Sequence, residues 1–180
     1  MRSCASLLVL SIVVSPVFAG DVPGISRFSS VNDHIYRGGQ PGPKALEQLA
    51  RLGVRTIIDL REGDHTADEE KFVVAAGMRY VHVPMAGLSA PTDDQIAKVL
   101  ALLGDSATGP VFVHCKRGAD RTGTVVACYR IRHDHWDNQK ALAEARKNGM
   151  SFFERGMQNY ILHFGAAPPA SPSQAVSASQ

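Results

Sequence analysis

The sequence predicts a single α/β domain in which helices cover both faces of a mostly parallel central sheet. Runs of β-branched residues alternate along the chain with segments that have the apolar spacing of helices, and this alternation is typical of βαβ units. Parallel strands need long crossovers and are buried on both faces, so their helices lie against the sheet. A chain of 180 residues has room for one such domain.

The composition excludes several classes of protein. Hydrophobic residues make up 44% of the chain and charged residues 20%, which is the range of globular domains rather than disordered chains. Lys and Arg exceed Asp and Glu by only 19 to 17, too small an excess to indicate nucleic acid or a membrane surface as the main partner. His133, Asp134 and His135 fall at an expected helix end, where His suits the dipole, so we expect no metal and no cofactor.

The two ends of the chain are not expected to belong to the domain. Residues 1–19 have a positive Arg2, an apolar stretch too short to span a membrane, and small residues before a cleavage point after Ala19, as in a secretory signal peptide. Residues 166–180 are Ala, Pro, Ser, Gln and Val without charge, which predicts a disordered tail. The domain is therefore expected over 20–165, in an exported protein without stable membrane insertion once the signal is removed.

Each element follows from local patterns. Strands are expected where β-branched and aromatic residues run together, at 34–36, 54–60, 78–83 and 111–114. Helices are expected where apolar residues recur at helical spacing, at 43–52, 68–76, 122–133, 138–148 and 151–164. A further helix is expected to begin after Thr92, which forms a capping box with Gln95, and to end at Leu103.

The loop after the strand at 111–114 is where we expect the chemistry, because ligands of such sheets bind at the carboxyl ends of strands. It reads His114-Cys115-Lys116-Arg117-Gly118-Ala119-Asp120-Arg121-Thr122-Gly123. Backbone N–H groups of a loop between a strand and a helix turn inward, and the helix adds its positive end. The loop from Lys116 to Arg121 is therefore expected to bind a phosphate dianion.

A cysteine beside such a cradle is a candidate nucleophile, because the cradle that binds an anion also stabilises a thiolate. Arg121 has the planar guanidinium that holds two phosphate oxygens, and Gly118 allows a tight backbone turn beneath the ligand. Thr122 is expected to cap the helix and to donate its hydroxyl to the sulfur of Cys115. We expect attack on phosphorus and a covalent phosphocysteine.

The loop resembles the signature H-C-x5-R-[S/T]-G of the cysteine-dependent protein tyrosine and dual-specificity phosphatase superfamily, and every fixed position is met. Two upstream stretches, 36–41 (YRGGQP) and 52–61 (LGVRTIIDLR), resemble small bacterial and plant-and-fungal atypical members. The resemblance implies Cys115 as nucleophile, Arg121 as phosphate clamp, Thr122 as an aid to the departing thiolate and His114 as an orienter of Cys115.

Two cysteines in an exported chain invite a disulfide, but Cys115 and Cys128 are poorly placed for one. Cys115 ends a strand and Cys128 lies nearly two turns into the next helix, so their backbones are expected to be too far apart. Cys128 is expected to be a residue of the helix core.

The general acid is the open point of the site. Many relatives take the acid from an Asp about thirty residues before the cysteine, and 81–85 (VHVPM) has no carboxylate. Asp120 is the first candidate, because myotubularin-like and Sac-like lipid phosphatases have Asp at this offset. Asp93, Asp94 and Asp64 are the others. Each candidate also has a non-catalytic explanation. Asp93 and Asp94 suit the N-terminus of a helix, and Asp64 suits a solvated loop. Asp120 suits an ion pair with Lys116 or Arg117.

The substrate also stays open between a phosphorylated protein, a phosphoinositide and an inositol phosphate. Lys116 and Arg117 make the loop more basic than one phosphate requires, although both suit a solvated rim. Two other functions compete with an exported phosphatase: a non-catalytic phosphate-binding module on the same fold, and a rhodanese-like enzyme that transfers sulfur through Cys115.

Overall fold

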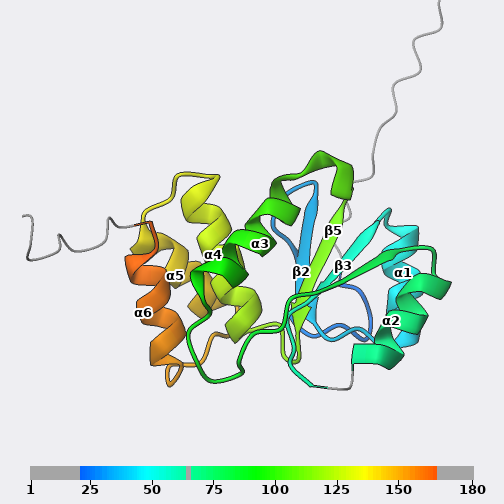
Figure 1. Cartoon of the computed structure of the whole chain (residues 1–180), viewed down its shortest axis with the longest axis horizontal. Coiled ribbons are helices and arrows are strands. Elements are labelled where there is room, and N and C mark those ends of the chain that lie inside the picture. The colour runs from blue at the N-terminus through cyan, green and yellow to red at the C-terminus, as the bar shows by residue number, and fades with distance from the viewer. Residues whose placement is uncertain (1–20, 64–65, 166–180) are drawn as a thin grey trace, which may run out of the picture.

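A computed structural model describes residues 21–63 and 66–165, and these form the predicted α/β domain (Figure 1). Its strands are β1 (Ser29–Ser30), β2 (Ile35–Gly39), β3 (Thr56–Asp59), β4 (Arg79–His82) and β5 (Val111–Cys115). Its helices are α1 (Pro43–Arg51), α2 (Thr66–Ala75), α3 (Asp93–Gly104), α4 (Asp120–Arg132), α5 (Asn138–Lys147) and α6 (Arg155–His163), with a 3₁₀ turn at Ser106–Thr108. The predicted signal peptide and tail lie outside the described residues.

The sheet has the order β1-β2-β5-β3-β4, and only β1 runs antiparallel to its neighbour. The central strand β5 pairs in parallel with β2 on one side and β3 on the other. The carboxyl end of β5 therefore lies in the middle of one sheet edge, between the ends of two neighbouring strands. This placement positions the loop that follows Cys115.

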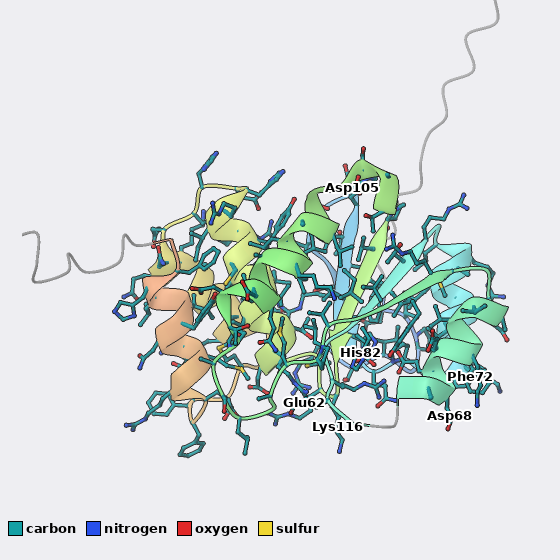
Figure 2. The ribbon with its side chains drawn as sticks, in the orientation of Figure 1. Glu62, Asp68, Phe72, His82, Asp105 and Lys116 are labelled. Carbon is teal, nitrogen blue, oxygen red and sulfur yellow. The ribbon has the colours of Figure 1, made fainter. Side chains whose placement is uncertain are left out.

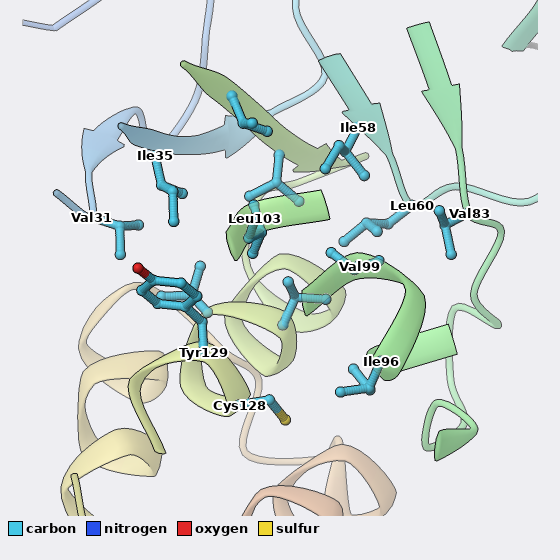
Figure 3. Close-up of a cluster of buried hydrophobic side chains, with 14 of the residues drawn as sticks. Val31, Ile35, Ile58, Leu60, Val83, Ile96, Val99, Leu103, Cys128 and Tyr129 are labelled. Carbon is cyan, nitrogen blue, oxygen red and sulfur yellow. The ribbon is translucent and has the colours of Figure 1, made fainter. Parts of the chain in front are cut away.

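Alternate residues of the buried strands face opposite sides of the sheet, and each side has its own core. Ile58 and Val113 face α3 and α4, where they pack with Ile96, Val99 and Tyr129 (Figure 3). On the other face, two strand residues pack against α1 and α2 in a second cluster, Ile57 and Phe112. Outside α4, helices α5 and α6 close a third cluster. This confirms the predicted helices on both faces.

The largest departure from the expected elements is at α6, which begins at Arg155 rather than at Ser151. The Gln158 side chain donates to the carbonyl oxygens of Ser151 and Phe152, so the chain before α6 is fixed as a turn. The short edge strand β1 was not predicted, because two serines have no strand pattern. Among the described helices, none is long and apolar enough to cross a bilayer.

Candidate active site

The loop predicted to be catalytic, residues 116–119 and called the catalytic loop below, follows Cys115 at the end of β5 and leads directly into α4. Cys115 is only 2% exposed and pairs in register with Gly39 of β2. The Lys116 side chain points away from the lower edge of the sheet in Figure 2, and it is exposed. The loop is therefore anchored at a buried cysteine and opens at its rim to solvent.

Gly118 is the residue that brings the loop against β2. Its φ is +71°, and a Cβ built there would lie 2.3 Å from the carbonyl carbon of Gly38 and 2.4 Å from the nitrogen of Gly39. A side chain at Gly39 would in turn meet Ser26 and the backbone of Arg117. The predicted role of Gly118 in a tight turn is thus explained by a backbone-to-backbone contact as well as by its positive φ.

Three consecutive carbonyl groups of the loop are bound from its outer side. The carbonyl oxygen of Lys116 accepts from the Gln40 N–H at 3.3 Å, that of Arg117 from Arg27 at 3.1 Å, and that of Gly118 from Arg37 at 2.6 Å. In a trans peptide the N–H points opposite to the carbonyl. The next three N–H groups, at residues 117–119, therefore face the inner side of the loop, as an anion-binding nest requires.

Arg37 places a buried cation behind the loop. The residue is 2% exposed, and burial lowers the pKa of its guanidinium to about 10, opposed by the negative charges of Glu144 and Cys115. Arg37 is still cationic at neutral pH, so its field favours an anion bound in the loop. Arg37 lies in the YRGGQP stretch that carries the family resemblance, but sequence reasoning assigned it no role.

Two residues in the first turn of α4 border the loop, Arg121 at its mouth and Thr122 at its base. The Arg121 guanidinium donates to the carbonyl oxygens of Met85 at 3.2 Å and Leu60 at 3.4 Å, which hold it over the strand ends. Thr122 is fully buried, and its hydroxyl has no hydrogen-bond partner among the described residues. That free donor suits the predicted bond to the sulfur. The predicted cap is wrong, because Ala119 is the N-cap residue.

Asp120 forms the ion pair that was the alternative to a catalytic role. One carboxylate oxygen accepts from Arg117 at 2.5 Å, and the other accepts from the backbone N–H of Ser151 at 2.8 Å. The residue is 6% exposed. Asp120 therefore connects the catalytic loop to the turn before α6, and both of its oxygens are engaged.

The other candidate acids lie elsewhere. Asp93 accepts from the Tyr160 hydroxyl at 2.7 Å, so its contact is with α6 and not with the loop. Asp94 is exposed in the first turn of α3, behind the capping box of Thr92 and Gln95 that the sequence predicted. Asp64 falls outside the described residues. Among the described candidates, only Asp120 touches the loop.

His114 lies beside a buried charge network that sequence reasoning missed, although neither of its ring nitrogens makes a hydrogen bond to a described residue. Its Nε2 lies 2.8 Å from a Glu69 oxygen and 3.9 Å from Asp59, with the ring and both carboxylates at most 4% exposed. Arg61 donates to both carboxylates, and the Tyr80 hydroxyl donates to Asp59 at 2.7 Å. Burial alone would raise the pKa of Asp59, but these hydrogen bonds outweigh it and hold that pKa below 3.8.

Asp59, Glu69 and His114 also have ligand atoms within 4.8 Å of one another, the spacing of a metal site. Arg61 already donates to both carboxylates, at 2.5 Å to Asp59 and 2.6 Å to Glu69. A guanidinium in this position supplies the positive charge that a metal ion would supply. The cluster therefore fits a role in holding His114 beside Cys115. No local pattern could have identified it, because Asp59 and Glu69 come from different elements.

Both described cysteines are free, as expected, and both are buried. Cys128 lies in α4 within the core between the sheet and the helices (Figure 3). Burial raises the pKa of its thiol well above the usual range. Cys128 is therefore a core residue without nucleophilic character.

Comparison with known proteins agrees with this geometry. A family model described as DSP-PTPase phosphatase fused to NAD+ kinase matches residues 22–161. Inositol diphosphatase DSP3 of Arabidopsis thaliana is 33% identical over 144 residues, which are 77% of this chain and 70% of that protein. Dual specificity protein phosphatase TpbA of Pseudomonas aeruginosa is 30% identical over 135 residues, 75% of this chain and 60% of that protein.

Solved structures give the same fold. The crystal structure of P. aeruginosa TpbA matches with a TM-score of 0.64 at 27% identity, over 77% of this chain and 89% of that one. The catalytic domain of the S. cerevisiae PP-IP phosphatase SIW14 matches with a TM-score of 0.72 at 22% identity, over 88% and 94%. With the loop His114–Gly123 in the required place between a strand and a helix, this chain belongs to the DSP-PTPase phosphatase family.

Proposed function

We propose that this chain hydrolyses phosphate monoesters through a phosphocysteine on Cys115. The observation that carries the proposal is the outward anchoring of three loop carbonyls, which turns three N–H groups toward the position above Cys115. Such a nest binds a phosphoryl group and stabilises the charge that spreads over its oxygens during transfer.

The reaction has two steps. In the first, the Cys115 thiolate forms an S–P bond while the P–O bond to the leaving group breaks, and the departing oxygen takes up a proton. In the second, water attacks phosphorus, the S–P bond breaks and inorganic phosphate leaves. Arg121 holds two phosphoryl oxygens, and the free Thr122 hydroxyl donates to the sulfur as it departs.

Asp120 is the proton donor to test first, because it is a carboxylate in contact with the loop itself. Its bonds to Arg117 and Ser151 have to open before it can protonate a leaving group. If Asp120 is the acid, Asp120→Asn slows phosphotyrosine far more than an aryl phosphate with a good leaving group. An equal loss on both substrates would assign it the structural role alone.

We propose a singly phosphorylated substrate, with phosphotyrosine first. The pairing with Asp120 neutralises Arg117, which lowers the positive charge that a polyanion would need. A structural relative, a cysteine-to-serine variant of P. aeruginosa TpbA in complex with pTyr, is 28% identical to this chain. The second candidate is an inositol diphosphate, which the similarity to DSP3 and the exposed Lys116 favour.

The test is phosphate release by the chain from Gly20 to Gln180, which contains every described residue. The substrates are an aryl phosphate, phosphotyrosine and phosphoserine peptides, a phosphoinositide and inositol polyphosphates. Cys115→Ser abolishes turnover, whereas Cys128→Ser retains it, because that cysteine is a core residue. Binding without turnover would instead support the phosphate-binding module, and persulfide formation on Cys115 with thiosulfate would support sulfur transfer.

We further propose that the protein is exported, on the strength of the pattern in residues 1–19. Expression of the full chain in a bacterium, followed by cell fractionation and N-terminal sequencing, tests this. The expected product is an extracytoplasmic chain that begins at Gly20. An intact chain that stays in the cytosol would overturn the proposal.

A further inference from the structure

Two phenylalanines protrude from the turn between α5 and α6. Phe152 is 69% exposed and Phe153 is 87% exposed, with their rings edge to face at 6.3 Å. Leu88, in the loop between β4 and α3, is 85% exposed. In Figure 1 both of these segments lie along the same lower edge as the loop after β5. Leu88, Phe152 and Phe153 together form the apolar rim.

The apolar rim is fixed to the catalytic loop by hydrogen bonds. The N–H of Ser151 donates to Asp120, whose other oxygen accepts from Arg117. Gln158 then holds the carbonyl oxygens of Ser151 and Phe152. The exposure of the two rings is therefore a property of an anchored turn.

The loop of Leu88 also contacts the first turn of α6. A Cβ at Gly156 would lie 3.2 Å from the backbone nitrogen of Ala90, so helix and loop are in close contact there. Leu88 lies two residues before Ala90, and Phe153 three residues before Gly156. The segments that carry Leu88 and Phe153 therefore flank the contact between Ala90 and Gly156, next to the catalytic loop.

Three exposed basic residues lie around the apolar rim. Arg27, whose guanidinium reaches the loop carbonyl of Arg117, is exposed, as are Lys116 and Arg155. The acidic residues Asp120 and Glu154 are buried. Exposed carboxylates offset part of this charge: Glu62, which follows β3 at the lower edge in Figure 2, and Asp93 and Asp94, which begin α3 after the loop of Leu88. Protruding aromatic and aliphatic side chains beside basic residues are the composition of an interfacial membrane anchor.

We propose that the apolar rim and its basic neighbours adsorb to a bilayer that contains anionic lipid. Rings that are 69% and 87% exposed stand out of the surface, and a bilayer can surround a protruding ring whereas a bound peptide covers one side of it. Adsorption would set the mouth of the catalytic loop against the membrane. Its consequence, hydrolysis of phosphate monoesters at the membrane surface, rests on the proposed function, whereas adsorption itself does not need catalysis.

The experiment measures cosedimentation of the chain from Gly20 to Gln180 with vesicles of phosphatidylcholine, with and without phosphatidylserine. The double variant Phe152→Ser/Phe153→Ser should bind the anionic vesicles about 100-fold more weakly, about tenfold for each ring withdrawn from water. Phe72→Ser is the matched control, because Phe72 is 49% exposed on α2, far from α6 in Figure 2. It should bind as the unchanged chain does.

A charge variant tests the second half of the proposal. Arg155→Gln should weaken binding to the anionic vesicles about fivefold and leave binding to phosphatidylcholine alone unchanged. The double phenylalanine variant should keep its turnover of a water-soluble aryl phosphate but lose turnover of a phosphotyrosyl peptide anchored in vesicles by an acyl chain. Repeating the sedimentation with Cys115→Ser separates adsorption from catalysis, since that variant should still bind.

Three results would overturn the proposal. The first is that the unchanged chain does not sediment with anionic vesicles. The second is that Phe72→Ser weakens binding as much as the double variant does. The third is that the double variant binds vesicles normally but loses turnover of a soluble phosphotyrosyl peptide, which would make the apolar rim a peptide surface. Vesicle binding without any phosphatase activity would instead leave adsorption standing and refute the proposed function.

Discussion

Replacing Gly118 by alanine tests whether the contact of the catalytic loop with β2 sets its geometry. The residue has φ +71°, which by itself costs a side chain about 1–2 kcal/mol. The added Cβ would also lie 2.3 Å from the carbonyl carbon of Gly38, where an ordinary contact begins near 3.4 Å. Backbone lies on both sides of this contact, so no side chain can move to relieve it.

The size of the effect follows from the difference between this 2.3 Å distance and an ordinary contact distance of 3.4 Å. Loop and strand must separate by about 1 Å, and a misplacement of about 1 Å in a catalytic group costs about 100-fold in rate. We therefore expect Gly118→Ala to lower kcat/KM for an aryl phosphate about 100-fold, because the inward N–H groups move with the loop. The protein should also lose more than about 2 kcal/mol of unfolding free energy, since the clash adds to the backbone strain.

The matched control is Gly77→Ala. Gly77 has φ +77°, but a Cβ there meets nothing within 4 Å. This variant should lose about 1–2 kcal/mol in urea unfolding and keep its activity. If Gly118→Ala folds and its kcat/KM stays within about threefold of the parent value, the loop is not positioned by this contact and the reasoning is wrong.

Two further predictions concern the buried groups around the site. Because hydrogen bonds from Arg61 and Tyr80 hold the pKa of Asp59 below 3.8, its stabilising contribution is present above that pH and is lost as the pH falls through the lower folded value. Asp59→Asn should lower the free energy of unfolding by about 3 kcal/mol at neutral pH. The difference in unfolding free energy between this variant and the parent protein should become smaller in urea titrations below pH 3.8, and a difference that grows there would contradict the assignment. Burial raises the pKa of the Cys128 thiol, so iodoacetamide at neutral pH should label Cys115 alone in the chain from Gly20, and mass spectrometry that finds Cys128 labelled would show that α4 opens.

The elements were predictable because their signals are local. The β-branched run around Ile57 and the capping box of Thr92 and Gln95 each act over a few residues, and the structure has a strand and a helix there. The start of α6 was not predictable from such signals. Its first expected turn is fixed by the Gln158 side chain and by the bond from Ser151 to Asp120, which join segments 6 to 31 residues apart.

The sequence by itself determined the class of chemistry at this site. Cys115, Gly118 and Arg121 have a spacing that needs only a strand, a tight turn and a helix start, and all three are local conditions. The structure adds why the turn is tight, since Gly118 lies against the backbone of Gly38.

Only the tertiary structure decided what surrounds the loop. Arg37 behind it, the Asp59–Glu69 pair beside His114, and the bond from Ser151, in the turn before α6, to Asp120 all join residues from separate elements. Such contacts depend on the order and register of strands, which place distant segments at one sheet edge. Burial then removes water from these charges, so each must find its partner within the protein, and no local pattern in the sequence specifies which partner that is.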